Sequence, residues 1–194
     1  MAELIDEASN IESTTVGVYR TAATVKGGRR FSFGSLVVVG NRRGRVGYGY
    51  GKSNEVPSAI EKAQKAAKRN LQPVKMIGGT ITHEVEGVFG SSRVRLIPAS
   101  PGTGVVAGAT VRAVLEMAGV TDCLTKCYGS TTATNVVKAV FDGLSRLRHP
   151  SQIAELRGVE LGETVIEQRI KRAGGAVTPT TGELVAATDE TEGA

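Results

Sequence analysis

Phe31-Ser-Phe-Gly-Ser-Leu-Val-Val-Val39 is the stretch that decides the fold of the first half of this sequence. Its aromatic and β-branched residues are typical of a β-strand. The next run, Arg45-Val-Gly-Tyr-Gly-Tyr-Gly-Lys52, predicts a second strand in which glycines alternate with larger side chains. One face of that strand then carries side chains, and the other is bare backbone. If the side-chain face meets a helix, Tyr48 and Tyr50 are core residues.

The residues on either side complete a first unit. Val16 to Val25 alternates loosely and predicts another strand, joined to the first by a basic turn at Lys26–Arg30. Glu55 to Leu71 predicts a helix that tolerates Pro57 in its first turn. We therefore expect a three-stranded antiparallel sheet plus one helix. The residues expected in its core are Phe31, Phe33, Val37, Ile60, Ala63, Ala67 and Leu71.

The second half alternates strand-like and helix-like segments near its end, which favours a layered α/β arrangement within an α+β protein. Its expected strands are Val74–Ile81, Glu84–Phe89, Arg93–Ile97 and Cys123–Tyr128. Its expected helices are Val105–Ala118, Ala133–Leu147, Ser151–Arg157 and Thr164–Arg172.

These segments suggest four parts. Residues 1–13 form an acidic N-terminal arm, residues 14–77 the sheet-and-helix unit, and residues 78–160 the layered domain. Residues 161–194 form a peripheral helix and an acidic tail that we expect to be disordered after Gly174.

Composition excludes several classes of protein. Hydrophobic residues make up 40% and charged residues 22%, as in a soluble folded chain. No run of 18 apolar residues and no signal peptide is present, so we expect no membrane association. Cys123 and Cys127 lie about 13 Å apart if their segment is a strand, which is too far for a disulfide. We expect a cytoplasmic protein with free thiols.

The distribution of charge points to a polyanionic partner. The net charge is only +5, but residues 26–75 hold twelve basic and two acidic residues. Arginine and lysine on glycine turns suit contact with phosphates. The candidate RNA-binding residues are Lys26, Gly27, Gly28, Arg29, Arg30, Arg42, Arg43, Arg45, Lys52, Lys62, Lys65 and Arg69.

Other motifs leave alternatives open. Val46 to Ser53 ends in Gly-Lys-Ser, but Val46 replaces the first glycine of a phosphate-binding loop. Gly47-Tyr-Gly-Tyr50 is similar to an RNA-stacking strand but lacks its basic residue. Pro101–Gly104 and Gly129–Thr132 each precede an expected helix whose first turn could hold a phosphate. The first of these loosely resembles the phosphate loop of galactokinase-type kinases. An enzyme that binds a phosphate is therefore a further hypothesis for the function.

Catalytic and metal-binding groups are scarce. His83 and His149 are the two histidines, and neither has metal-ligand spacing. The two cysteines are separated by three residues rather than two, which argues against zinc. We expect no metal, no cofactor and no catalysis.

Four separated blocks resemble one family, the bacterial small-subunit ribosomal protein five. They are Thr24-Val-Lys-Gly-Gly-Arg-Arg-Phe-Ser-Phe33, Gly44-Arg-Val-Gly-Tyr-Gly-Tyr-Gly-Lys52, Pro98-Ala-Ser-Pro-Gly-Thr-Gly-Val-Val-Ala-Gly108 and Tyr128-Gly-Ser-Thr-Thr132. The resemblance covers roughly residues 14–160. It implies a first domain similar to double-stranded-RNA-binding domains, and a second α/β domain shared with translation factors and with those kinases.

The resemblance also implies a function. Such a protein would bind ribosomal RNA between the head and body of the small subunit, touch proteins four and eight, and influence translational accuracy. Lys26, Gly27, Gly28 and Arg29 match the loop that reaches the RNA of the head. Gly104 and Arg112 match positions at the contact with protein four. We therefore expect a structural, RNA-binding component of the small ribosomal subunit. The alternative is an RNA-binding module that acts off the ribosome.

Overall fold

The computed structural model describes residues 11–159, 162 and 164–172, and its α+β class confirms the expected one. The first half forms an antiparallel sheet in the order β1-β2-β3-β4, with one helix after β3. Its elements are β1 (Glu12–Val25), β2 (Gly28–Gly40), β3 (Arg45–Ser53), α2 (Val56–Arg69) and β4 (Gln72–Pro73). The two-residue β4 adds a short fourth strand to the three that were expected.

Helix α2 packs on the glycine face of β3. A Cβ added to Gly49 would lie 2.2 Å from the Ala63 carbonyl oxygen, and one on Gly51 would lie 2.2 Å from that of Ala59. Two strand residues span about 6.7 Å and four helical residues about 6 Å, so successive glycines meet successive helical turns. The buried residues of α2 are accordingly small: Ala59, Ala63 and Ala67.

The core interpretation of the β3 tyrosines is right for Tyr48 and wrong for Tyr50, and neither ring faces α2. Tyr48 is half-buried on the opposite face, where its ring centroid lies 4.7 Å from that of Phe141 in the second half of the chain. Tyr50 is 48% exposed and lies over Gly34, whose added Cβ would meet the Tyr50 hydroxyl oxygen. The physical reason is the close approach of α2, which leaves no room for a ring between helix and sheet.

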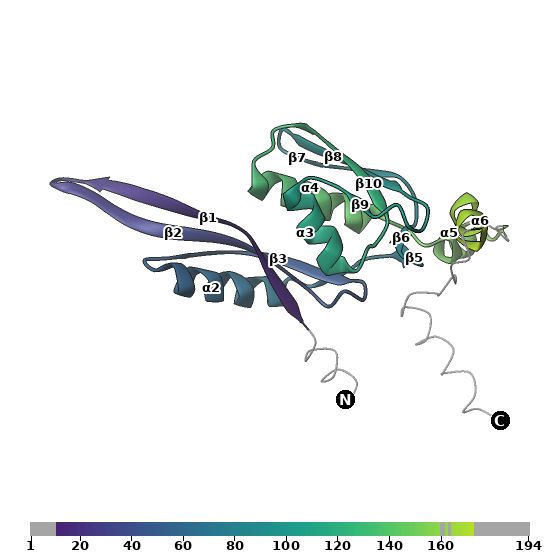
Figure 1. The fold of residues 1–194 in the computed structure, drawn as a ribbon, viewed down its shortest axis with the longest axis horizontal. Helices are drawn as coiled ribbons and strands as arrows, with labels where there is room; N and C mark the ends of the chain where they lie inside the picture. The colour runs from purple at the N-terminus through teal and green to yellow at the C-terminus, as the bar shows by residue number, and fades with distance from the viewer. Residues whose placement is uncertain (1–10, 160–161, 163, 173–194) are drawn as a thin grey trace, which may run out of the picture.

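The second half forms a mixed sheet with the order β7-β8-β10-β9. Helices α3 and α4 lie between this sheet and the first one, and α2 lies on the far side of the first sheet (Figure 1). The elements are β5 (Met76–Ile77), β6 (Thr80–Ile81), β7 (Val85–Phe89), β8 (Ser92–Pro98), β9 (Val105–Val106), α3 (Ala109–Ala118), β10 (Cys123–Gly129) and α4 (Ala133–Arg146).

Two expected elements differ from those observed. Val74–Ile81 is not one strand, because Gly78 at φ +59° reverses the chain and pairs β5 with β6. The helix expected from Val105 begins only at Ala109, because Val105 and Val106 pair in parallel with Cys123 and Leu124. The Pro101–Gly104 turn therefore leads into a strand. It does not lie at the start of a helix, so the predicted phosphate site at a helix N-terminus is wrong for this turn.

The two halves share one hydrophobic core. Leu36, Val38 and Val46 of the first sheet belong to the same buried cluster as Leu115 and Phe141 of the second half. The backbone continues this contact at the end of α3, whose last carbonyls would otherwise lack partners. The Arg42 N–H donates to the Met117 carbonyl at 3.1 Å, and the Gly44 N–H donates to that of Ala118 at 2.9 Å.

Two short helices follow, α5 (Pro150–Arg157) and α6 (Val165–Arg172). Ile170 is the one buried residue of α6. The expected acidic tail after Gly174, and most of the expected N-terminal arm, lie outside the described residues. Among the helices that the structure describes, none is long and apolar enough to cross a membrane.

Candidate nucleic-acid interface

The β1–β2 hairpin extends beyond the rest of the sheet. β3 ends at Ser53, which pairs with Phe33, and from there β1 and β2 pair only with each other, as far as Val25 and Gly28. The five residues of β2 between Phe33 and the turn, Gly28 to Ser32, span about 16 Å. The result is a two-stranded projection that points away from both sheets (Figure 1).

The tip of the hairpin carries cations with open space around them. Its turn is shorter than expected, because only Lys26 and Gly27 lie outside the strands. Gly27 adopts φ +92°, and a Cβ added there or at Gly28 would meet no atom within 4 Å. Lys26, Arg29 and Arg30 are all exposed. This arrangement lets another backbone approach closely between positive charges.

An exposed aromatic ring accompanies these cations. Phe31, expected in the core, is 46% exposed because it lies on the part of the hairpin that no other element covers. The Arg20 guanidinium lies 3.6 Å from its ring centroid, a cation–π contact. Arg20 is absent from the sequence-based candidates. Strand alternation could have identified it: Arg20 pairs with Phe33, and Phe31 lies two residues from Phe33 on the same face of β2.

Beyond Glu12 at the start of β1, the hairpin has no acidic residue of its own. Residues 13–54 contain no aspartate or glutamate, yet they contain eight cations. Among the described residues, no ion pair involves Lys26, Arg29 or Arg30. Their charge is therefore not compensated within the described part of the chain, and it favours an anionic partner.

The second basic turn has a different environment. The Asn41 side-chain oxygen accepts the backbone N–H groups of Arg43 at 2.9 Å and Arg45 at 3.0 Å, which fixes the turn. Arg42 adopts φ +54° and forms an ion pair with Glu12 at 2.7 Å. Arg43 and Arg45 are exposed beside it. The side chain of Arg42 thus has a partner in the protein itself.

The remaining candidates lie on or beside α2. Lys62, Lys65 and Arg69 are exposed on the helix surface away from its buried alanines, and Lys52 is exposed near the end of β3. Arg29 and Arg42 are thirteen positions apart in the sequence, which corresponds to about 40 Å of extended strand. The structure therefore separates the cations at the hairpin tip from those at the β2–β3 turn, and Lys62, Lys65 and Arg69 lie on a third element, α2.

The two candidate protein-contact residues flank β9. Gly104 adopts φ +77°, and its N–H donates to the buried Asp122 carboxylate at 2.9 Å. A Cβ added to Gly104 would meet nothing within 4 Å. Arg112 lies in the first turn of α3 and is exposed, as expected, while Val111 and Val114 beside it are buried. Both positions are therefore accessible to a neighbouring molecule.

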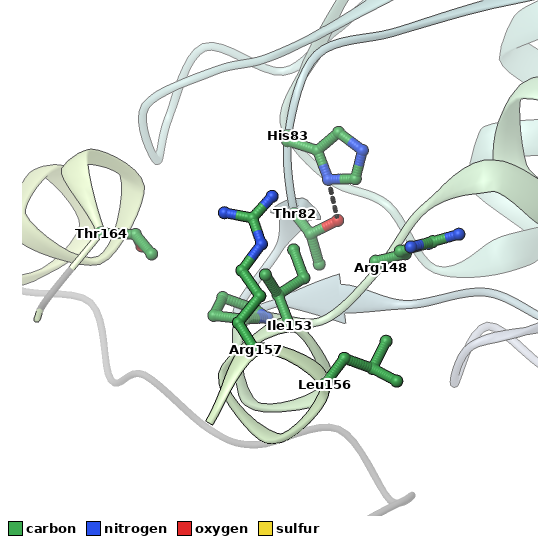
Figure 2. A pocket seen from close by; sticks show the side chains of 8 residues that line it. Thr82, His83, Arg148, Ile153, Leu156, Arg157 and Thr164 are labelled. Atoms are coloured by element: carbon green, nitrogen blue, oxygen red, sulfur yellow. Dashed lines mark hydrogen bonds between the residues drawn. The ribbon is translucent and has the colours of Figure 1, made fainter. Parts of the chain in front are cut away.

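Groups with possible catalytic roles are dispersed. Burial raises the pKa of the Cys123 thiol to about 11, and it also raises the pKa of Cys127. Within the described ranges, no cluster of three metal-ligating side chains occurs. A cavity of about 410 Å³ lies beside α5, and there the Thr82 hydroxyl and His83 Nδ1 are 3.0 Å apart (Figure 2). Its other lining residues are Arg148, Pro150, Ile153, Leu156, Arg157 and Thr164.

Comparison with known protein families gives two matches in the order of the chain. Residues 11–75 match the family model described as ribosomal protein S5, N-terminal domain. Residues 87–157 match the model described as ribosomal protein S5, C-terminal domain. The two models together cover well over half of the 194 residues.

Proposed function

Because the chain belongs to the ribosomal protein S5 family, it is an RNA-binding protein of the small ribosomal subunit, and we propose that it connects the head and body of that subunit. The family is a structural component of the translation machinery. The finer assignments rest on the geometry of the exposed cations and on the resemblance of their motifs to the family. Its place would be the cytoplasmic ribosome.

The hairpin carries this proposal. It extends about 16 Å beyond the sheet, presents three cations without partners among the described residues, and has glycines at its turn. A projection of this shape suits an RNA surface separate from the one contacted by the body of the protein. In this proposal, Lys26, Arg29 and Arg30 neutralise phosphates of the head RNA.

The cations of α2 supply a second contact. Lys62, Lys65 and Arg69 lie on a rigid helix whose opposite side packs against β3. Lys52, Arg43 and Arg45 extend the positive surface along both ends of β3. We assign these residues to ribosomal RNA of the body, because a rigid base and a free projection can hold two RNA segments at a fixed separation.

Contacts with ribosomal proteins four and eight complete the proposal. The half-buried Gly104 precedes β9 and the exposed Arg112 lies in the first turn of α3, and we propose that protein four rests on this part of the surface. An exposed arginine is suited to a partner carboxylate. Through this contact the protein would influence decoding accuracy.

The test is assembly of the full-length protein into small subunits. Subunits are reconstituted with wild-type protein or with the triple variant Lys26→Gln, Arg29→Gln and Arg30→Gln, and separated on a sucrose gradient. Wild-type protein should sediment with the small subunit in equal stoichiometry. The triple variant should be depleted from that peak, and its remaining binding should fall less steeply with salt than that of the wild type, because fewer phosphates are neutralised.

A matched control removes three exposed cations elsewhere: Arg148→Gln, Arg157→Gln and Arg169→Gln. This variant should remain in the small-subunit peak. Equal loss of both variants would show a requirement for total charge and contradict a role for the hairpin. Wild-type protein found only in light fractions would favour the alternative function, an RNA-binding module that acts off the ribosome.

The accuracy assignment has its own test. Arg112→Leu should leave the unfolding free energy within about 0.5 kcal/mol of wild type, because the side chain is exposed. Misreading in a reporter assay should rise if Arg112 holds a partner carboxylate. Arg112→Lys retains the charge and should give an intermediate rate. A misreading rate equal to wild type in Arg112→Leu would contradict the assignment.

A further inference from the structure

The sheet of the second half has one face that no described helix covers. α3 and α4 pack on the side that carries the buried Val94, Leu96 and Cys123. Because side chains alternate along a strand, Leu124, Lys126 and Tyr128 of β10 point to the other side. Figure 1 shows this sheet on the outside of the molecule, with α3 and α4 beneath it.

Tyr128 lies between two cations on this open face. Arg93 is its direct neighbour on β8, and Lys126 is two residues away on its own strand. Neighbouring strands lie about 5 Å apart and alternate residues about 7 Å apart, so both cations lie within side-chain reach of the position of Tyr128. Tyr128 is 48% exposed, so one side of its ring is open to solvent.

These two cations have no partner among the described residues. Arg95 forms an ion pair with Glu84, and that carboxylate raises the pKa of Arg95. No ion pair in the same part of the chain involves Arg93 or Lys126. The charges of Arg93 and Lys126 are therefore available to an external anion.

The chemistry of this cluster fits a nucleotide better than a protein. An aromatic ring on an open antiparallel sheet can stack on an unpaired base, while flanking cations neutralise the adjacent phosphates. Tyrosine and arginine are enriched at protein–protein interfaces and lysine is depleted, but two unpaired like charges beside one ring would need a strongly acidic protein partner. Phosphates supply that charge regardless of sequence.

We propose that Tyr128, Arg93 and Lys126 form a second RNA-binding site, which takes an unpaired nucleotide of single-stranded RNA on the open face of the β7-β8-β10-β9 sheet. The base stacks on the Tyr128 ring, and the two cations contact its neighbouring phosphates. This site is separate from the proposed contacts of the hairpin and α2, all of which lie within residues 26–69.

The experiment isolates this site within the full-length chain. The hairpin substitutions Lys26→Gln, Arg29→Gln and Arg30→Gln provide the background, and binding of a fluorescein-labelled 12-mer of uridine is followed by anisotropy. In that background, Tyr128→Leu should weaken binding about 5- to 100-fold, the range measured for losing one stacked base. Tyr128→Phe keeps the ring and should stay within about twofold of its parent.

Leu124→Ala is the control on the same strand and face. It should bind within about twofold of the background protein, since Leu124 contributes no stacking or charge. Equal weakening by Leu124→Ala and Tyr128→Leu would indicate an apolar docking face for a protein and overturn the proposal. Unchanged affinity in Tyr128→Leu would overturn it as well.

The hairpin and the sheet are distinguished by a second arm. The same 12-mer containing 4-thiouridine is crosslinked to otherwise wild-type protein, and the adducts are mapped by mass spectrometry. Adducts on both the hairpin and β10 support both sites, and an adduct on the hairpin alone overturns only the sheet site. An adduct on β10 alone supports the sheet site and contradicts the hairpin contact, whereas no adduct on either contradicts both.

Discussion

The two ends of β2 carry turns of similar composition but different environments. Lys26-Gly-Gly-Arg29 at one end extends into open space, where a Cβ added to either glycine meets nothing within 4 Å. Asn41-Arg-Arg-Gly44 at the other end is held against α3 by two backbone hydrogen bonds. Both combine glycine with arginine, but the backbone of the second turn is bonded to α3 and its Arg42 pairs with Glu12, whereas the first turn has neither kind of contact among the described residues.

The difference shows what charge alone can establish. A basic glycine turn predicts contact with a phosphate, but the same residues can serve to join two parts of a fold. At the second turn, Arg42 pairs with Glu12 and its N–H donates to the carbonyl of Met117. The first turn is therefore the one we assign to the head RNA, and the second joins the two halves of the protein through its backbone and Arg42, while its Arg43 and Arg45 remain assigned to the RNA of the body.

Two glycines with nearly equal backbone angles test this contrast most strongly. Gly27 lies at φ +92° and Gly119 at φ +93°, but a Cβ on Gly119 would lie 2.1 Å from the Arg42 carbonyl oxygen. Gly27→Ala should cost about 1 kcal/mol of unfolding free energy, the strain of the left-handed angle. Gly119→Ala adds a backbone overlap and should cost about 3 kcal/mol or more.

Urea denaturation of the free proteins measures both values. Among molecules that remain folded, Gly27→Ala should weaken RNA binding more than Gly119→Ala does, because Gly27 lies at the proposed RNA contact and Gly119 does not. Equal destabilisation by the two substitutions would show that the junction at Arg42 yields easily, and would contradict its role as a rigid connection.

Charge removal at the two turns should separate binding from structure. The triple variant Lys26→Gln, Arg29→Gln and Arg30→Gln should reduce the salt slope of log affinity for small-subunit ribosomal RNA by about 2, since each phosphate contact contributes roughly 0.7–0.9. Arg42→Gln should change that slope by much less than the value expected for one phosphate contact. Filter binding across a salt series gives both slopes. A decrease of about one in the salt slope of Arg42→Gln would show that the Arg42 side chain contacts RNA.

The ion pair at the second turn should have the smallest effect. Glu12 and Arg42 side chains are 51% and 58% exposed, and exposed pairs contribute about 0.2–1 kcal/mol. Glu12→Gln should lower the unfolding free energy by no more than this, and 1 M salt should erase the difference. A loss that persists in 1 M salt would show that Glu12 acts through something other than charge.

Much of the fold follows from sequence patterns. The β-branched run ending at Val39 and the glycine alternation at 47–51 correctly predict two paired strands. The helical spacing of Val137, Val140 and Leu144 correctly predicts the buried side of α4. These patterns are local, and the periodicity of the apolar residues within each segment is enough to define it as a strand or a helix.

Apart from the local turn at Gly78, the failures depend on long-range packing. Val105 and Val106 form a strand only because β10 lies beside them, and no local pattern reports that neighbour. Tyr50 is exposed because α2 occupies the glycine face, a choice between two faces that alternation leaves open. For the candidate site, sequence supplies the cations but not their separation into three groups.

Amide hydrogen exchange of the free protein and of the assembled small subunit tests the central contrast most directly. In the free protein, amides at residues 26–30 should exchange rapidly, whereas those of Arg42 and Gly44 should be protected by their bonds to α3. On assembly, residues 26–30 should become strongly protected and the second turn should change little. Unchanged exchange at residues 26–30, with new protection at the second turn, would contradict the account.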